Sequence, residues 1–394
     1  MKSYKIALLP GDGIGPEVTA EAVKAVEAAG SRHGFEVEWV AYPFGAAHYN
    51  RTGGETLPDS ALNEMGLCDA MLLGAVGDPS VKPGILERGI LLKLRFRFDQ
   101  YINLRPARSY RGVPCPVPLP DGERIDSVVV RENTEDFYMG IGAAAQPGCG
   151  DGFAKDGFAE DGFADVPFEA ERGLYKLAGR LSAKFEPDCA AALQIGALTR
   201  PGIERVTRYA FDLARQRGEK EVVLASKANA VPFLYGFLDE ETRRVAKDYA
   251  ADIALRIQNV DALCYHLVRK PASHGVILCP NLFGDIVSDL LSGLTGGLGL
   301  GAGGNIGDGL SMFEPVHGSA PDIAGTGKAN PLAAILAAAM MLGHIGESAG
   351  AESIDAAVTS CLEKGGGDGG ERPFELGGRA SCRAVGDAVA RRIG

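Results

Sequence analysis

The sequence predicts an α/β fold with a largely parallel sheet. Short β-branched or apolar runs alternate with amphipathic stretches of helical period, the pattern of helices packed on a mostly parallel sheet. The Gly-rich turn 11–15 does not have the G-x-G-x-x-G spacing of a Rossmann dinucleotide-binding domain. At 394 residues the chain is long enough for two sizeable structural units.

The N-terminal segment shows this alternation clearly. Residues 5–9 read as a strand, and the turn 11–15 follows it. Pro16 suits the first helical position, with Glu17 in the positively polarised first turn. We expect Gly30 to end this helix. Its apolar face is expected to consist of Val18, Ala22, Val26 and Ala29.

Further elements follow along the chain. A one-faced helix is indicated by Ile203, Val206, Ala210 and Leu213, and the apolar stretch 331–342 suits a buried helix. The remaining strands are expected at residues 37–41, 70–74, 127–130, 222–225 and 276–279. One segment breaks the pattern, because residues 151–165 repeat Asp-Gly-Phe-Ala three times. We interpret this repeat as an extended or mobile insertion, with a functional lid as the alternative.

Composition limits the possible partners. A net charge of -11 argues against nucleic acid or an anionic membrane, but not against a small anionic substrate held by buried arginines. No signal peptide is recognisable, and the longest apolar stretch is too short for a membrane span. The eight cysteines form no C-x-x-C pair, so neither a zinc knuckle nor a disulfide framework is expected. We therefore expect a reduced, cytoplasmic protein.

The strongest chemical signal is the segment 281–289, Asn-Leu-Phe-Gly-Asp-Ile-Val-Ser-Asp, directly after a predicted strand. A helix beginning there stacks Asp285 and Asp289 on one face, where two like charges repel unless a cation lies between them. Oxygen ligands suit Mg²⁺ or Mn²⁺. An isolated D-x-x-x-D is more often a pair of solvated acids.

Four further segments contain candidate site residues, but each one alone is a weak indication of function. One segment contains Lys227, shortly after the strand 222–225. Another is residues 95–105, with Arg95 and Arg105 at its two ends. Guanidinium groups bind carboxylates bidentately, although a lone arginine is usually a surface residue. The other two segments are Arg131–Tyr138, after the strand 127–130, and Glu314–Ala324, with glycines on both sides.

Together the five segments, in this order, resemble the β-decarboxylating dehydrogenases of the isocitrate/isopropylmalate dehydrogenase family. The resemblance extends from residues 11–17 to 376–378. It implies a two-domain α/β fold distinct from the Rossmann fold. The large cofactor-binding domain would comprise residues 1–102 and 296–394, and a smaller substrate and dimerisation domain residues 103–295. A clasp is expected at about 140–172. It also implies a homodimer whose active sites are shared between the two chains.

The resemblance also implies site residues. Tyr138 and Lys227 match the catalytic pair, the lysine coming from the partner. Asp261, Asp285 and Asp289 match metal ligands, with Asp261 from the partner. The other matches are the substrate-binding residues Arg95, Arg105 and Arg131 and the cofactor-binding residues Glu314, His317, Gly318, Ser319, Ala320, Asp322, Ile323 and Asn330.

The cofactor expectation rests on Asp322. NADP-linked relatives usually carry Lys-Tyr where this chain has Asp322 and Ile323. An aspartate can accept hydrogen bonds from the ribose hydroxyls and repels a 2′-phosphate, so NAD is expected.

The substrate expectation rests on Arg88, in the segment that resembles the helix reading the C3 substituent of malate. It favours an anionic substituent, as in homoisocitrate, isocitrate or 3-phosphonomethylmalate, unless Arg88 points outward. The stretch 98–105 is closer to the tartrate/D-malate branch. D-malate, tartrate and 3-isopropylmalate therefore remain alternative substrates. A non-catalytic regulatory subunit is another alternative, although such subunits usually lose a catalytic residue and none is lost here.

Two departures from the family pattern stand out. Ser226 occupies the position before the lysine where many relatives have aspartate. The Asp-Gly-Phe-Ala repeat falls where the family has its intersubunit clasp, so an enlarged clasp is expected.

Overall fold

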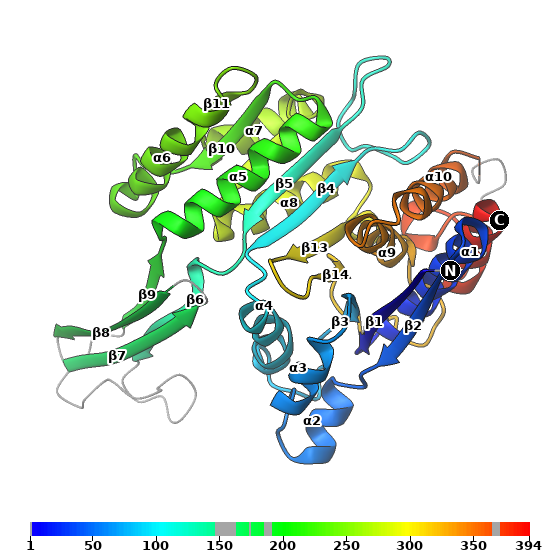
Figure 1. Ribbon diagram of the computed structural model, residues 1–394, viewed down its shortest axis with the longest axis horizontal. Coiled ribbons are helices and arrows are strands. Elements are labelled where there is room, and N and C mark those ends of the chain that lie inside the picture. Colours follow the sequence, from blue (N-terminus) through cyan, green and yellow to red (C-terminus); the bar gives the residue numbers. More distant parts are fainter. Residues whose placement is uncertain (1, 146–162, 173–174, 185–190, 365–370) are drawn as a thin grey trace.

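A ten-stranded sheet runs through the computed structural model (Figure 1), which describes residues 2–145, 163–172, 175–184, 191–364 and 371–394. The strand order is β11-β10-β12-β5-β4-β13-β14-β3-β1-β2. The strands of this sheet are β1 (Lys2–Gly11), β2 (Phe35–Ala41), β3 (Ala70–Ala75), β4 (Ile102–Arg108), β5 (Asp126–Glu132), β10 (Glu221–Ser226), β11 (Ala254–Asn259), β12 (Val276–Cys279), β13 (Ala302–Ile306) and β14 (Met312–Pro315).

The sheet is mixed, with two parallel regions joined by an antiparallel centre. β11, β10, β12 and β5 run parallel to one another, as do β14, β3, β1 and β2. β4 and β13 pair antiparallel with both of their neighbours. The prediction of a largely parallel α/β sheet is therefore confirmed. The carboxyl ends of β10, β11, β12 and β5 share one edge of the sheet.

Helices cover the sheet and bury its apolar side chains in four large clusters. Two clusters draw their buried members from residues 6–110 and 300–393, and two from residues 102–294. The helices are α1 (Gly15–His33), α2 (Ala46–Thr52), α3 (Asp59–Met65), α4 (Lys93–Arg97), α5 (Arg200–Arg217), α6 (Pro232–Ala246), α7 (Val260–Arg269), α8 (Asn281–Thr295), α9 (Leu332–His344), α10 (Ser348–Lys364) and α11 (Cys382–Ile393).

Helix α1 differs from its prediction at the C-terminus. The expected apolar face is fully buried, but the helix continues through Gly30 to His33 and ends at Gly34, whose φ is 81°. Gly30 is needed for another reason, because a Cβ there would lie 2.6 Å from the backbone oxygen of Phe35. Close approach of the following strand, rather than helix termination, explains this glycine.

The four strands β6 (Asp136–Ala145), β7 (Phe163–Arg172), β8 (Tyr175–Lys184) and β9 (Ala191–Ala197) lie apart from the large sheet, at one side of the molecule (Figure 1). β6 pairs with β9 and β7 with β8, both antiparallel. Most of the Asp-Gly-Phe-Ala repeat, residues 151–162, lies outside the described residues.

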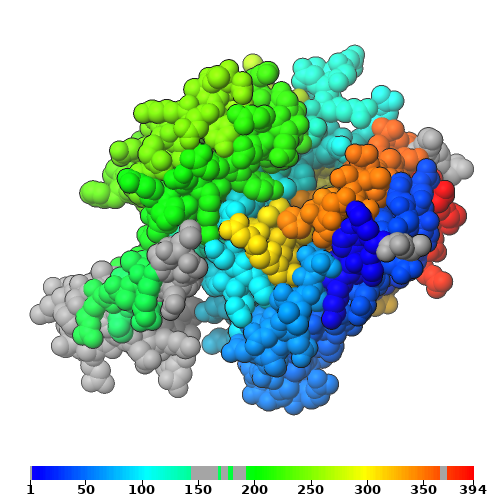
Figure 2. Space-filling view, in the orientation of Figure 1, coloured from blue at the N-terminus to red at the C-terminus, as the bar shows by residue number. Residues whose placement is uncertain are grey.

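The two ends of the chain occupy the same part of the molecule. Figure 2 shows the blue N-terminal and the orange-to-red C-terminal segments together, with the green middle of the chain to one side. Helices α1, α9, α10 and α11 contact one another in this region. Among the described residues, no helix is long and apolar enough to cross a membrane.

Candidate active site

The two acidic residues of the strongest sequence motif lie one turn apart near the start of α8, as their spacing indicates. β12 ends at Cys279 and α8 begins at Asn281, so Asp285 and Asp289 project near the carboxyl edge of the sheet. Both carboxylates face one guanidinium nitrogen, Nη1 of Arg105, at 3.2 and 3.4 Å. The same nitrogen donates to Ser288 Oγ at 2.8 Å.

Asp285 also accepts hydrogen bonds from two other expected site residues. Arg131 donates from Nη1 to Oδ1 at 2.6 Å, and Tyr138 donates its hydroxyl to Oδ2 at 2.7 Å. The Arg131 guanidinium lies 5.0 Å from the centroid of the Tyr138 ring. Asn281 fixes this arginine, because its backbone oxygen and Oδ1 accept from Arg131 Nε at 2.9 and 3.0 Å.

Burial and neighbouring charges shift the pKa values of these groups. Burial favours a raised pKa for Asp285, but Arg131 and Arg105 outweigh it and lower that pKa below the usual value. Burial raises the pKa of Asp289. Burial and the hydrogen bond to Asp285 raise the pKa of Tyr138, which keeps its hydroxyl proton available at neutral pH. Burial, together with Arg105, lowers the pKa of Arg131 to about 10.

Lys227 and Asp261 form a separate pair. Lys227 Nζ lies 2.6 Å from Asp261 Oδ1, and the hydrogen bond from the lysine lowers the pKa of Asp261. Ser226 and Asn259, at the ends of β10 and β11, are register partners, so both groups lie at the same sheet edge as Asp285. Within one chain, however, the described residues contain no group of three His, Cys, Asp or Glu side chains that could hold a metal.

Arg95 lies in a buried polar network. Its Nη2 donates to Glu314 Oε1 at 3.1 Å, and the two side chains are 6% and 10% exposed. Buried Nε atoms of Arg95 and Arg105 have no hydrogen-bond partner among the described residues. Unpaired guanidinium N–H groups at a buried site fit the expectation of an anionic ligand.

Arg88 is not brought together with the other arginines. Its Nε donates to Gly84 O at 2.9 Å, and the side chain is exposed beside a surface hollow lined by residues that include Asp59, Asn63 and Arg97. The backbone explains this placement, because residues 87–92 form a π-helical turn directly before α4. A π turn takes up about one more residue than an α turn, so Glu87, and not Arg88, aligns with Arg95.

Glu87 lies toward the predicted cofactor segment. A Cβ placed on Gly77 would be 3.4 Å from Glu87 Oε1 and 3.6 Å from Ser319 Oγ. The segment 317–323 joins the N-terminal Gly-rich turn, since Ile14 N donates to Ser319 O at 2.8 Å. Asp322 is exposed, and Asn330 donates to Glu375 Oε2 at 2.9 Å. Burial lowers the pKa of His317.

The metal expectation fits the donor set in part. Asp285 and Asp289 offer carboxylate oxygens on one helix turn, the chemistry that Mg²⁺ and Mn²⁺ prefer. Asp261 pairs with Lys227 and does not form a group with Asp285 and Asp289 among the described residues of one chain.

Sequence reasoning missed several residues of this region. Asn281 and Ser288 stand inside the segment 281–289 and were not expected to hold arginines. Asp12, in the Gly-rich turn, accepts from Ala46 N and Gly77 N at 2.8 and 3.0 Å. The signal that could have found Asp12 is a carboxylate between two glycines, Gly11 and Gly13, in a tight turn.

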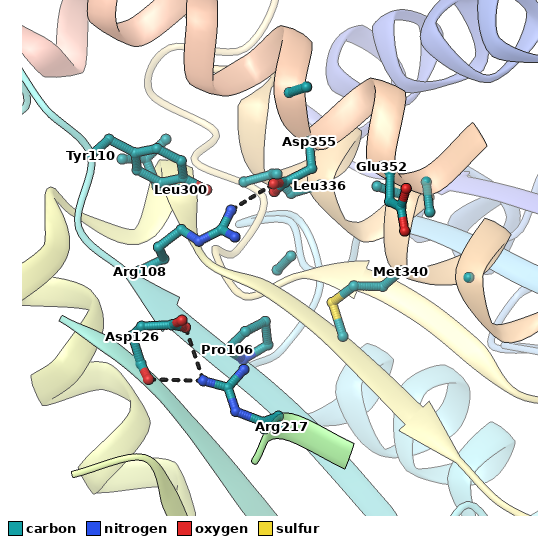
Figure 3. A pocket seen from close by; sticks show the side chains of 15 residues that line it. Pro106, Arg108, Tyr110, Asp126, Arg217, Leu300, Leu336, Met340, Glu352 and Asp355 are labelled. Atoms are coloured by element: carbon teal, nitrogen blue, oxygen red, sulfur yellow. Dashed lines mark hydrogen bonds and ion pairs between the residues drawn. The ribbon is translucent and has the colours of Figure 1, made fainter. Parts of the chain in front are cut away.

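A separate hollow of about 440 Å³ lies at the carboxyl end of β4, beside Pro106 and Arg108 (Figure 3). Arg108 pairs there with Asp355 at 2.6 Å and Arg217 with Asp126 at 3.0 Å. Its floor is mostly apolar, and no expected site residue lines it.

Comparison with known proteins accounts for this arrangement. The family model described as isocitrate/isopropylmalate dehydrogenase matches residues 5–389. The chain belongs to the isocitrate/isopropylmalate dehydrogenase family. It is an oxidoreductase that carries out oxidative decarboxylation, and the expected NAD-dependent β-decarboxylating dehydrogenase class is confirmed.

Individual family members are similar over nearly their whole length. The 3-isopropylmalate dehydrogenase of Thermobifida fusca is 40% identical, with 100% of this chain and 98% of the relative covered. That of Mycobacterium avium is 42% identical over 96% and 99%. The crystal structure of isocitrate dehydrogenase from Methylococcus capsulatus superposes with a TM-score of 0.80 at 35% identity, covering 99% of both chains. The expected two-domain family fold is confirmed, whereas the homoisocitrate or tartrate/D-malate branch finds no support among these relatives.

Proposed function

We propose that this chain oxidises and decarboxylates 3-isopropylmalate with NAD. The choice of substrate rests on the π turn at residues 87–92. This turn leaves Arg88 on the surface and places Glu87 on the same helix face as Arg95. Relatives named 3-isopropylmalate dehydrogenase support the same choice. An apolar C3 substituent needs no cationic partner, and a carboxylate at position 87 disfavours an anionic one. This substrate was the alternative to an anionic substituent in the sequence interpretation.

The proposed roles follow from the charges. Arg95, Arg105 and Arg131 bind the substrate carboxylates. When bound, the metal supplies polarisation of the 2-hydroxyl and NAD supplies the hydride acceptor for C2. Lys227 of a second copy accepts the hydroxyl proton. After carbon dioxide leaves, the Tyr138 hydroxyl donates its proton to C3.

We also propose a homodimer with shared active sites. Lys227 and Asp261 pair with each other, and the described residues of one chain contain no group of three acidic, His or Cys side chains that could hold a metal. In this proposal each site therefore takes its lysine and one metal ligand from the second copy. Helices near this edge carry exposed large apolar side chains, which suits an interface. They are Phe233 on α6, Tyr265 and Val268 on α7, and Ile286 on α8.

The domain division remains a proposal with support from the core. Residues 1–102 and 296–394 would form the large domain, residues 103–295 the smaller one, and about 140–172 the clasp. The apolar clusters divide at nearly the same places. Strands β6 to β9 lie apart from the large sheet, as a clasp would, but they extend from Asp136 in β6 to Ala197 in β9, beyond residues 140–172 on both sides.

One assay tests substrate and cofactor together. NADH or NADPH formation is followed with Mn²⁺ and 3-isopropylmalate, isocitrate, homoisocitrate, 3-phosphonomethylmalate, D-malate and tartrate. We expect the highest kcat/KM with 3-isopropylmalate and NAD, and a weaker NAD preference in Asp322→Lys/Ile323→Tyr. A wild-type preference for an anionic malate contradicts the substrate proposal, and equal kcat/KM with NAD and NADP contradicts the role of Asp322.

A further inference from the structure

Buried amides connect the two ends of the arginine group, and they have no part in the roles given above. Asn103 on β4 is the register partner of Arg131 on β5 and of Asn305 on β13. Register partners project from the same face of a sheet, so these three side chains form a row. Asn305 is 0% exposed and Asn103 is 1% exposed.

Hydrogen bonds orient the Asn305 amide within this row. Asn305 Oδ1 accepts from the Nδ2 atoms of Asn103 and Asn133, at 2.9 and 3.0 Å. Two donors on the oxygen fix the orientation of the Asn305 amide. Its own Nδ2 therefore points the other way and donates to Glu314 Oε1 at 2.7 Å.

Glu314 links the oriented Asn305 amide to Arg95. The oxygen that accepts from Asn305 also accepts from Arg95 Nη2, at 3.1 Å. A buried carboxylate held by two donors has a fixed rotamer, and its guanidinium partner is fixed with it. Without the amide donor, Glu314 loses one of the two side-chain contacts that orient it.

We propose that Asn305 is a positioning residue for substrate binding, holding the Arg95 guanidinium in place through Glu314. Asn305 itself touches neither substrate nor cofactor. The inference rests on the proposed role of Arg95 as a ligand of a substrate carboxylate, but not on which C3 substituent the substrate carries.

A charge swap tests the proposal. Asn305→Asp removes the Nδ2 donor and places a second carboxylate beside that of Glu314. We expect KM for the malate substrate to rise about tenfold or more, with little change in KM for NAD. Adding Glu314→Gln restores a donor between the two positions with the same net charge. The double variant should return to within about threefold of wild-type KM, although Glu314→Gln alone raises it.

The pH dependence supplies a readout that a purely structural role would not change. Two adjacent buried carboxylates share a proton more readily as pH falls, and a protonated carboxyl can donate to its neighbour. The ratio of variant to wild-type KM should therefore decrease as pH is lowered in Asn305→Asp. It should stay constant in the double variant.

Asn103→Ala is the matched control, because it removes an equally buried amide, while Asn133 still donates to Asn305 Oδ1 and Asn305 keeps its Nδ2 donor for Glu314. Its KM should change less than threefold. Circular dichroism melting of each variant establishes folding, and the double variant carries the test if Asn305→Asp does not fold. The proposal is overturned if folded Asn305→Asp binds substrate like wild type, or if the double variant is worse than either single one. All assays use whichever malate the wild type turns over best, so a wrong substrate assignment does not affect this result.

Discussion

Two helical segments, α8 and residues 87–97, carry Asp285, Asp289 and Arg95 of the candidate site, and their backbones differ. α8 is α-helical from Asn281 to Thr295, so Asp285 and Asp289 lie one turn apart and share Arg105. The segment 87–97 begins as a π turn and becomes α-helical at Lys93. Every residue before that junction is displaced by one position relative to Arg95. In α8, the regular helix places the two carboxylates one turn apart. In residues 87–97, the π turn decides which residue lies on the same face as Arg95.

The largest expected effect lies in the regular helix. Asp285→Asn removes a charge that both Arg131 and Arg105 contact and that the proposed metal site would require. We expect kcat/KM to fall by more than about 100-fold and the Mn²⁺ concentration for half-activity to rise. Titration of activity with Mn²⁺ after EDTA treatment measures both. Full wild-type turnover in EDTA would eliminate the metal site at Asp285 and Asp289.

The π turn offers a comparison of two adjacent residues, with a smaller expected change in kcat/KM. Glu87→Ala and Arg88→Ala alter neighbouring residues of opposite charge in one turn. We expect Glu87→Ala to lower kcat/KM about tenfold or more, because Glu87 lies beside the segment that carries Ser319. Arg88→Ala should change it less than about twofold with any malate, because the Arg88 side chain donates back to Gly84 O and lies beside the surface hollow lined by Asn63 and Arg97. The reverse order would show that Arg88 faces the substrate.

The smallest effect concerns stability at the amino end of β12. His274, just before β12, is buried, and burial together with Arg256 lowers its pKa from 6.5 to about 4. Because the unfolded chain binds this proton first, its contribution to stability is complete above pH 6.5 and is lost as pH falls toward 4.

The variant His274→Gln isolates this contribution. Urea unfolding at pH 7.5 and pH 5 should show a smaller loss of stability in the variant than in the wild type. An equal loss would mean that His274 titrates normally in the folded protein.

The comparison of the two segments also explains what sequence could predict. The α/β class, the main strands and the spacing of Asp285 and Asp289 follow from local periodicity, which tertiary packing here reinforces. The direction of Arg88 depends on a single π turn, for which the residues 87–92 carry no periodic signal. Likewise, the close approach of Phe35 that requires Gly30 is a tertiary contact.

The buried amides were out of reach for a related reason. Asn103, Asn133 and Asn305 lie far apart in the chain, and only strand pairing places them together. The reverse holds for Asn281 and Ser288, whose contacts arise from the α-helical spacing of a motif already recognised.

The pairing of Lys227 with Asp261 has a consequence for mixtures of defective chains. If each active site takes its base from one copy and its acid from the other, chains carrying Lys227→Ala and chains carrying Tyr138→Phe are each inactive alone. When the two are unfolded together and refolded, a mixed dimer has one site with both lesions and one with neither. Half of the dimers are then expected to be mixed, each with one working site, so two dead enzymes yield about a quarter of wild-type activity.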